Sequence, residues 1–365
     1  MTGEDAPVSV EEVELLPPGP RDVVVEVRAA GVCHSDIAGL RGYIGLQPPT
    51  ILGHEVAGVV VGVGGEVRSV CPGDRIIGSL VPVCGECPWC LGHQTHLCAR
   101  TGDVRATIRA RTSTGAPVTA MLGLGAFAEQ MVIDERLAVR VHSDLPDEQL
   151  ALIGCGIATG VGAVLFTADV RAGSSVAVIG CGGVGQSVIQ GARIAGAAQI
   201  VAIDPLASKR QAALRSGATH VLDPGDADTA EAVKALSHGR GVDFAFEVVG
   251  QPSTMAAAYD SARRGGTVVC LGIPSPDARF ELNASDFFRA EKRVVGSYYG
   301  STQVRAGFQT FADLISAGRL DAASLISHTY SLDAVPEALA ALEQGVTLRG
   351  VVQPQLRGAS SDPAG

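Results

Sequence analysis

Four cysteines crowd into one short stretch of this 365-residue chain, "CGECPWCLGHQTHLC". They are Cys84, Cys87, Cys90 and Cys98. Zn²⁺ prefers thiolates in structural sites, and a CxxC step lets one turn present two sulfurs to the same ion. Four protein ligands leave no coordination position for a substrate. The spacing therefore predicts a closed, structural zinc lobe, in which the intervening His93 and His96 are exposed and bind no metal.

The composition indicates the compartment and the class of partner. Lys and Arg number 28 against 38 Asp and Glu, a net charge of −10, which disfavours nucleic acid and anionic membranes as partners. The N-terminus is acidic and polar, unlike a signal peptide, and no apolar run is expected to be long enough for a membrane span. We therefore expect a cytoplasmic protein whose thiols stay reduced, which argues against disulfides in the lobe.

A second motif predicts a cofactor. Gly180, Gly182 and Gly185 form GxGxxG between an apolar strand pattern and a helical one. In that context, glycines permit a tight turn, and the helix N-terminus attracts a pyrophosphate. Asp204 follows nineteen residues after Gly185, where its carboxylate can bind the adenosine ribose and repel a 2′-phosphate. With Lys209 as the nearest cation, the pattern favours NAD over NADP.

Two further cysteines and one histidine suggest a second metal. Cys33 lies in "GVCHSDI", His54 in "LGHEVAG" and Cys155 in "LIGCGIATG". Two thiolates and one imidazole leave a position of the zinc open for a substrate oxygen, and this ligand set is the one known from alcohol dehydrogenase. The remaining cysteines, Cys71, Cys181 and Cys270, are expected to be small buried fillers, although a helix N-terminus could lower the thiol pKa of Cys181.

The elements that must position these residues follow two different sequence patterns. Residues 21–81 read as short β-strands with Gly and Pro turns, and sheet-like sequence resumes near residue 125. From about residue 156, strand and helix patterns alternate up to "TVVCLG", as in a doubly wound parallel sheet. Helical patterns follow at 307–318 and 334–345, and a strand at 349–352.

The sequence resembles the zinc-dependent medium-chain alcohol dehydrogenases over residues 8–353. "GVCHSD", "LGHEVAG", "PGDRI", the cysteine lobe, "LIGCGIATG", "GCGGVG" and "FEVVG" occur in family order. Within the family, it looks closest to the aryl and terpenoid alcohol dehydrogenases and to the thiol-dependent formaldehyde dehydrogenases. The resemblance implies an α/β fold with two domains. A GroES-like β-rich catalytic domain, residues 1–156 with 300–365, would carry both zinc sites, and residues 157–299 would form a Rossmann NAD-binding domain.

The resemblance also implies roles for individual residues. Cys33, His54 and Cys155 would hold the catalytic zinc, with Glu55 behind the metal and able to approach it. Asp36 would orient the ligand histidine, and Ser35 would receive the alcohol proton. Leu80 falls at a position that lines the substrate pocket. The implied cofactor-binding residues are His34, Thr159, Gly180, Gly182, Gly183, Val184, Gly185, Asp204, Lys209, Leu271, Ile273, Tyr299 and Arg349.

The sequence departs from the family pattern at three places. Ala38 stands where many members carry a histidine that completes the proton path to solvent. Members usually have an additional strand before the segment that aligns with "VSVEEVELLPPG". Four arginines of the 99–118 stretch could recognise an anionic substrate or thiol conjugate, although a solvated loop is the simpler interpretation: Arg100, Arg105, Arg109 and Arg111.

The leading interpretation is an NAD-dependent zinc alcohol dehydrogenase with two zinc ions per chain, acting on a primary or simple secondary alcohol or its aldehyde. One alternative is a dehydrogenase of thiol–formaldehyde adducts. Another, of a different class, is a non-catalytic zinc- and NAD-binding redox sensor, which would need neither an open zinc site nor Ser35. The resemblance also implies a homo-oligomer, with a dimer favoured over a tetramer.

Overall fold

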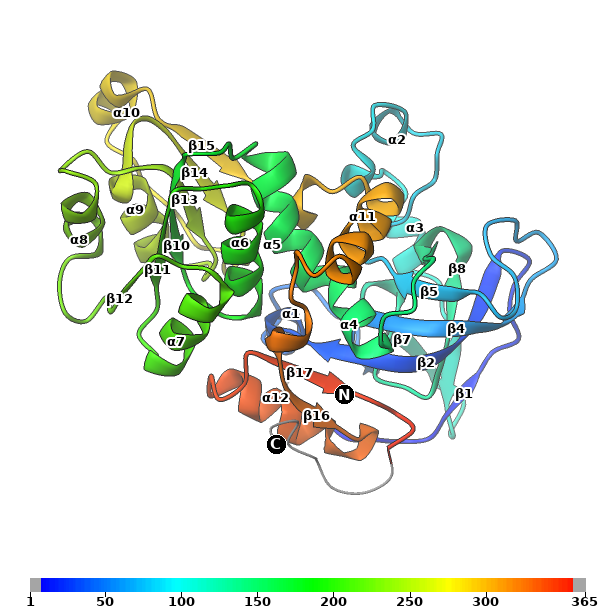
Figure 1. Ribbon diagram of the computed structural model, residues 1–365. Helices are drawn as coiled ribbons and strands as arrows, with labels where there is room; N and C mark the ends of the chain where they lie inside the picture. The colour runs from blue at the N-terminus through cyan, green and yellow to red at the C-terminus, as the bar shows by residue number, and fades with distance from the viewer. Residues whose placement is uncertain (1–7, 357–365) are drawn as a thin grey trace. The chain divides into compact units, whose positions relative to one another are not determined.

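The computed structural model describes residues 8–356, which are shown as coloured ribbon in Figure 1. The chain divides into two compact units. Among the described residues, the first comprises residues 8–156, 303–318 and 322–356, and the second comprises residues 157–302 and 319–321. The break after residue 156 lies where the sequence analysis expected it. The return to the first unit comes three residues later than expected, and residues 319–321 go back to the second unit.

The first unit is built on two β-sheets. One has the strand order β16-β17-β2-β4-β5-β9, with β8 pairing on β2, and the other has the order β1-β6-β7-β3. The strands are β1 (Val13–Leu15), β2 (Asp22–Val32), β3 (Thr50–Ile51), β4 (Glu55–Val63), β5 (Arg75–Gly78), β6 (Ala110–Thr112), β7 (Pro117–Ala120), β8 (Gln130–Asp134), β9 (Ala138–Arg140), β16 (Ile326–Tyr330) and β17 (Arg349–Val352).

Strand β2 organises the larger sheet. Its sequence alternates buried and half-buried residues along most of its length, as expected of a strand with one face on a core. It pairs antiparallel with β4, β8 and β17, so the strand end before Cys33 lies beside the start of β4 and of β17. The helices of this unit are α1 (His34–Leu40), α2 (Pro88–Leu91), α3 (Thr101–Arg105), α4 (Asp147–Leu152), α11 (Val304–Ser316) and α12 (Val335–Glu343).

The second unit is a parallel sheet with the strand order β12-β11-β10-β13-β14-β15. This is the doubly wound dinucleotide-binding order, in which ligands bind where the order reverses, beside the first strand. The strands are β10 (Ser175–Ile179), β11 (Gln199–Ile203), β12 (His220–Leu222), β13 (Val242–Glu247), β14 (Ala262–Cys270) and β15 (Arg293–Gly296). The helices are α5 (Ala158–Gly162), α6 (Gly183–Ile194), α7 (Ala207–Ser216), α8 (Thr229–Leu236), α9 (Pro252–Ser261) and α10 (Ala284–Ala290).

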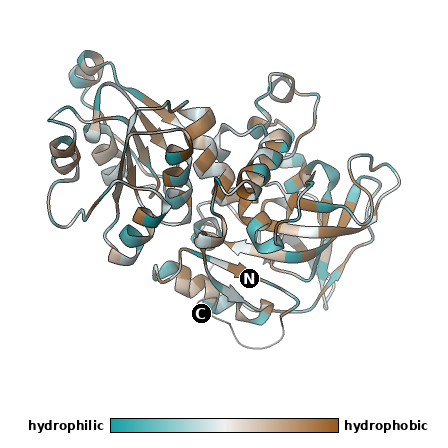
Figure 2. Ribbon diagram, in the orientation of Figure 1, coloured by the Kyte–Doolittle hydropathy of each residue, from teal (hydrophilic) through white to brown (hydrophobic). Residues whose placement is uncertain are grey.

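Both faces of the parallel sheet are covered. Val176 and Val178 of β10 belong to one apolar core together with α6, whereas Ala177 and Ile179 belong to another together with α9. Alternate residues of a strand point to opposite faces, so a strand buried on both sides reads as a continuous apolar run. Figure 2 shows these strands mainly in the hydrophobic colour and α7 mainly in the hydrophilic one.

Residues Asp147–Thr167 form one helical segment in which α4 and α5 alternate with two π-helical turns, Ile153–Ile157 and Ala163–Thr167. The expectation that no apolar run could span a membrane is wrong, because this helix is long and apolar enough to do so. However, 78% of its apolar window is buried inside the protein. Core helices pass the same test, so length and composition are weak evidence for a membrane span here.

Candidate metal centres and cofactor site

The four cysteines of the predicted lobe meet around α2, with their sulfurs within 4.8 Å of one another. The sulfurs of Cys84 and Cys90 are 3.7 Å apart. Zn–S bonds of about 2.3 Å in a tetrahedron put sulfurs ~3.8 Å apart, whereas a disulfide needs about 2.05 Å. All nine cysteines are free thiols. The lobe therefore fits a zinc ion held by four thiolates.

Backbone groups prepare the lobe for thiolate ligands. The N–H groups of Ala99 and Cys90 lower the pKa of the Cys87 thiol to about 6, whereas burial raises the pKa of Cys90 to about 12. The N–H of Cys87 donates to the sulfur of Cys84 over 3.4 Å. Because N–H donors stabilise the thiolate, which is the form that binds zinc, these contacts favour metal binding.

The two histidines of the lobe differ. His93 is exposed, as expected, but the expectation is wrong for His96, which is only 8% exposed. Burial lowers the pKa of His96, so its ring is neutral at physiological pH. Neither histidine belongs to the metal-ligand group among the described residues.

A second ligand group is assembled from distant parts of the first unit. Cys33 caps the start of α1, His54 directly precedes β4, and Cys155 lies in the π-helical turn Ile153–Ile157. Their ligand atoms and a carboxylate oxygen of Glu55 lie within 4.8 Å of one another, and all four residues are buried. His54 Nε2 is buried without a hydrogen-bond partner among the described residues. Such an atom is costly unless something binds it, and a metal ion held by Cys33, His54 and Cys155 fits.

Asp36 fixes the orientation of the ligand histidine. Its Oδ1 lies 3.3 Å from His54 Nδ1 and accepts from the N–H of Gly53 at 3.1 Å, while its Oδ2 accepts from the N–H of Cys33 at 2.9 Å. Although burial lowers it, the pKa of His54 is raised well above its usual value by the Asp36 carboxylate and the Cys33 thiol. With Nδ1 directed at Asp36, Nε2 is the nitrogen left for a metal.

Glu55 lies against Arg349 behind the ligand group. Glu55 Oε1 is 3.2 Å from Arg349 Nη1 and accepts from the N–H of Gly156 at 3.2 Å. Glu55 Oε2 is buried with no hydrogen-bond partner among the described residues. Burial raises the pKa of Glu55 to about 7, even though the Arg349 guanidinium lowers it. Arg349 is also buried, and its ion pair with Glu55 was not predicted from the sequence. Its predicted contact with a pyrophosphate stays a prediction.

The π-helical turn around Cys155 was not foreseen from the sequence. A Cβ on Gly154 would lie 2.8 Å from the Gly78 carbonyl oxygen, and one on Gly156 would lie 2.3 Å from Arg349 Nη2. Glycines therefore flank the ligand cysteine because the backbone passes too close to its neighbours for a side chain. π-Helical turns are rare and often occur at functional sites. The feature of the sequence that could have indicated this close packing is the "GCG" triplet, Gly154 to Gly156.

Other predicted residues of the first unit lie around the ligand group. The Ser35 hydroxyl lies 3.7 Å from the Cys33 sulfur and is partly accessible. His34 is exposed, and Ala38 and Leu80 are buried. The Leu80 carbonyl accepts from Arg105 Nη2 at 3.0 Å. The roles of Ser35, His34 and Leu80 stay predictions.

In the second unit, the glycine turn joins β10 to α6 at the reversal of the strand order. Gly180 has a φ of +94°, and a Cβ on Gly185 would lie 1.9 Å from the Gly180 carbonyl oxygen. A Cβ on Gly182 would meet nothing within 4 Å. The first and third glycines are thus required by the turn, whereas the middle one leaves space over the start of α6. This helix has no side-chain cap, so its N-terminus fits a pyrophosphate.

Asp204 directly follows β11, and its side chain binds the backbone of the glycine turn. Its Oδ2 accepts from the N–H of Cys181 and its Oδ1 from the N–H of Leu206, both at 2.9 Å. Each carboxylate oxygen can accept a further hydrogen bond, as a ribose hydroxyl would require. Of the other predicted cofactor residues, Tyr299 is buried, Gly183 starts α6, Ile273 is exposed, and the rest are half-buried: Thr159, Val184, Lys209 and Leu271.

Comparison with known proteins places these sites in a family. Residues 19–143 match the alcohol dehydrogenase GroES-like domain family, and residues 183–317 match the zinc-binding dehydrogenase family. S-(hydroxymethyl)glutathione dehydrogenase from Photobacterium damsela subsp. piscicida is 36% identical, with 96% of this chain and 97% of that protein covered. The chain belongs to the zinc-binding alcohol dehydrogenase family.

Solved structures agree with this family. Benzyl alcohol dehydrogenase from Acinetobacter calcoaceticus has a TM-score of 0.89 at 27% identity, with 96% of this chain and 97% of that chain covered. A zinc-binding dehydrogenase from Sinorhizobium meliloti 1021, solved bound to NADP, has a TM-score of 0.79 at 31% identity, with 95% and 96% covered. The expected family and fold, a GroES-like β-rich domain and a parallel-sheet dinucleotide domain, are confirmed.

The four arginines of the 99–118 stretch are held in different ways. Arg109 is buried and binds Asp22 through Nη2 at 2.8 Å and Nε at 3.1 Å. Arg100 lies 3.5 Å from Glu86. Arg105 binds the Leu80 carbonyl, and Arg111 is exposed. Arg109, the only buried residue of the four, is therefore not available to bind an anionic substrate.

The three cysteines outside both ligand groups also differ. Cys181 is fully buried, and burial raises the pKa of its thiol, so the alternative of an activated thiol in the glycine turn is disfavoured. Cys270 is half-buried. The expectation that Cys71 is a buried filler is wrong, because this cysteine is exposed in the turn before β5.

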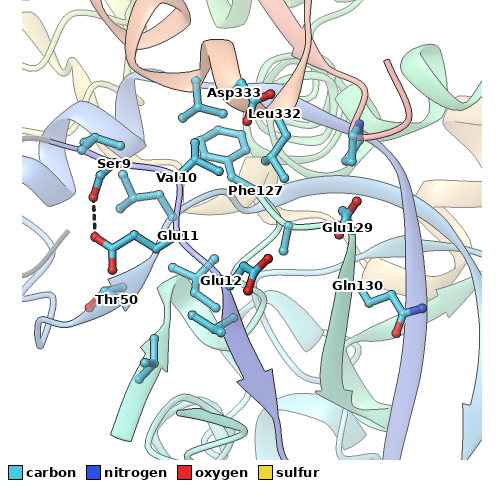
Figure 3. Close-up of a pocket in the computed structure, with 18 of the residues that line it drawn as sticks. Ser9, Val10, Glu11, Glu12, Thr50, Phe127, Glu129, Gln130, Leu332 and Asp333 are labelled. Carbon is cyan, nitrogen blue, oxygen red and sulfur yellow. Dashed lines mark hydrogen bonds between the residues drawn. The ribbon is translucent and has the colours of Figure 1, made fainter. Parts of the chain in front are cut away.

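A cavity of about 1080 Å³ opens in the first unit away from both ligand groups (Figure 3). It runs along residues 8–13 and contacts Phe127 and Leu332. None of the predicted ligand or cofactor residues lines it. Its walls include Glu11, Glu12, Glu26, Glu129 and Asp333, and among the described lining residues there is no Lys or Arg. The cavity is therefore separate from both metal-ligand groups.

Proposed function

We propose that this protein is an NAD-dependent zinc alcohol dehydrogenase that oxidises primary or simple secondary alcohols, aryl or terpenoid alcohols included, and reduces the aldehydes or ketones in reverse. The observation that carries the proposal is the ligand group of Cys33, His54 and Cys155, with its unpartnered His54 Nε2. Three protein ligands leave one position of a tetrahedral zinc for a substrate oxygen. The four-thiolate lobe supports a second, structural zinc.

When bound, the zinc ion supplies Lewis acidity and NAD supplies the hydride acceptor. The chain's own residues do the rest. Asp36 holds the His54 ring, and buried walls around Cys33 and Cys155 exclude water. The Ser35 hydroxyl, next to Cys33, takes the proton of the substrate hydroxyl. Ala38 offers no onward base, so the proton leaves Ser35 through water or the cofactor ribose.

NAD is proposed over NADP because the Asp204 carboxylate lies beside the glycine turn, where it would bind the adenosine ribose and repel a 2′-phosphate. The Sinorhizobium neighbour was solved with NADP, so the choice within the family differs from one protein to another. We also propose a cytoplasmic homodimer without nucleic-acid or membrane partners, in line with the net charge of −10.

A thiol–formaldehyde adduct is the second candidate substrate. The relative from Photobacterium is named for such an activity, which favours this candidate. Against it, Arg109 is buried in an ion pair with Asp22 and is not available to a substrate carboxylate. Free alcohols are therefore the first choice.

The test is NADH formation with NAD across aliphatic, aryl and terpenoid alcohols, and with formaldehyde plus a thiol. We expect turnover of free alcohols that a strong chelator abolishes and added zinc restores. Activity on the thiol adduct alone would establish the second candidate. Absence of any activity in protein that contains two zinc ions per chain would contradict both and support a non-catalytic sensor.

A further inference from the structure

Arg210 carries a guanidinium that is fixed beside Asp204 in the second unit. Its Nη1 donates to the backbone carbonyls of Asp204 at 2.7 Å and Pro205 at 2.9 Å. The same nitrogen is 2.8 Å from Oδ2 of Asp223. The side chains of Arg210 and Asp223 are only 18% and 26% exposed. The guanidinium is therefore held against the backbone at the ribose-binding carboxylate.

Asp223 occupies this place because of the strand register. In the parallel pair of β11 and β12, Ile203 lies opposite Leu222, so Asp204 and Asp223 follow adjacent strand ends. The Asp223 carboxylate is itself fixed, since its Oδ1 accepts from the N–H of Gly225 at 2.9 Å. Two carboxylates thus lie at neighbouring strand ends, and the Arg210 guanidinium binds one of them and the backbone of the other.

An arginine near the ribose carboxylate is the group that would recognise the 2′-phosphate of NADP. We propose that Asp223 is a positioning residue for cofactor choice, because it holds the Arg210 guanidinium away from a 2′-phosphate and adds a negative charge beside Asp204. Discrimination against NADP then depends on two carboxylates, of which Asp204 faces the ribose and Asp223 retains the cation. This inference rests on the proposed binding of NAD at the glycine turn.

The test compares Asp223→Asn with wild type in kcat/KM for NADP and for NAD. Releasing the guanidinium gains one charge-assisted hydrogen bond to the phosphate, so we expect the NADP/NAD ratio to rise about tenfold. The value for NAD itself should change by less than about threefold, because Asp204 is untouched. Adding Arg210→Gln to Asp223→Asn should remove the gain.

Asp226→Asn is the matched control. Asp226 is exposed on the same loop and makes no ion pair with a described residue. An equal rise of the ratio in Asp226→Asn would show that net charge alone acts, and would overturn the role of Asp223. An unchanged ratio in Asp223→Asn would overturn it as well. Asp223→Ser and thermal unfolding curves guard against a folding defect in the first variant.

Calorimetry on the zinc-loaded protein gives a readout that does not depend on turnover. Adenosine 2′,5′-bisphosphate should bind Asp223→Asn more tightly than wild type by about tenfold, with adenosine 5′-monophosphate unchanged. If wild type binds neither nucleotide, the proposed cofactor site fails, and this inference fails with it. If wild type binds adenosine 5′-monophosphate but the variant gains nothing for the bisphosphate, only the role of Asp223 is contradicted.

Discussion

The two ligand groups of the first unit use the same chemistry in opposite ways. The lobe takes four thiolates from one loop, Cys84 to Cys98, and the other group takes Cys33, His54 and Cys155 from three separate elements. A local loop can close around an ion by itself, so its metal contributes to folding. A set assembled by the sheet is positioned by the fold, and it leaves a place for substrate. Substitutions in each group should therefore have opposite effects on stability and on turnover.

The largest effect is expected for His54→Ala. We expect zinc content to fall from two ions to one per chain, and kcat/KM to fall on the order of 10³-fold, because Lewis acidity worth several kcal/mol is lost. Thermal unfolding should change little, since the lobe zinc remains. Elemental analysis and steady-state kinetics measure the two quantities. His93→Ala, in the exposed part of the lobe, is the control. Retention of both zinc ions in His54→Ala would refute the ligand assignment.

Cys98→Ser tests the opposite role. Loss of the lobe zinc should lower Tm by on the order of 10 °C, because a structural zinc contributes folding free energy directly. Turnover per folded molecule should stay within about threefold of wild type, because none of the three catalytic ligands is changed. Differential scanning calorimetry and zinc analysis provide the measurements. The exposed Cys71, outside both groups, provides the control Cys71→Ser. If the Cys98→Ser protein were inactive but as stable as wild type, the lobe would be the catalytic site and not a structural one.

Ser35→Ala removes a proton acceptor without removing a ligand. We expect kcat to fall on the order of 10²-fold, as for the loss of a general acid–base group, while both zinc ions are retained. Single-turnover measurements across pH locate the loss in the proton-transfer step. Ser35→Thr keeps a hydroxyl and should recover most of the activity. Wild-type turnover in Ser35→Ala would mean that the proton takes another path.

Asp36→Asn should weaken zinc binding at the catalytic group, although Asp36 is not itself a ligand. Asp36 lies beside His54 Nδ1, and loss of such a partner lowers metal affinity by about 10–100-fold. We expect activity to return when excess zinc is added, which His54→Ala should not allow. Competition with a chelator measures the affinity, and Asp103→Asn, an exposed carboxylate near the lobe, is the control. If Asp36→Asn bound zinc as tightly as wild type, Asp36 would serve only to cap the start of α1.

The difference between the two groups also explains how much the sequence alone could predict. The lobe and the glycine turn were predicted because their chemistry is local: cysteine spacing and glycine spacing specify the geometry within one turn. The position of β2 and the parallel sheet followed from apolar patterns that match strand periodicity. The Cys33, His54 and Cys155 set was recognised only through resemblance, since no local pattern joins residues on different elements.

What the sequence missed is non-local as well. The ion pair of Glu55 with Arg349 depends on the pairing of β17 with β2. The glycines beside Cys155 lie close to Gly78 and Arg349, which are also far away in sequence. His96 and Arg109 were both expected at the surface, and both are buried. Arg109 is held there by Asp22, which is far away in sequence. Spacing along the chain carries no information about such contacts.

The smallest expected effect concerns a carboxylate that, unlike Asp36, orders a loop without any metal. Glu135 Oε2 accepts from the N–H groups of Arg68 at 3.0 Å and Ser69 at 3.3 Å, and Oε1 lies 2.9 Å from Arg21 Nη2. Burial alone would raise the pKa of Glu135, but these contacts lower it below its usual value. Glu135→Gln should therefore destabilise the protein by about 1–2 kcal/mol at neutral pH.

The pH dependence of that loss gives the sharper test. A lowered folded-state pKa means that the charged form stabilises the fold above the unfolded pKa of about 4.3, and that this stabilisation is lost as pH falls through the folded pKa. The difference in unfolding free energy between wild type and Glu135→Gln should therefore shrink below about pH 4. Zinc loss in acid affects both proteins, so it cancels in the difference. Glu66→Gln, at an exposed glutamate of the neighbouring turn, should show no such trend. A pH-independent loss in Glu135→Gln would mean that the shape of the side chain, and not its charge, holds the loop.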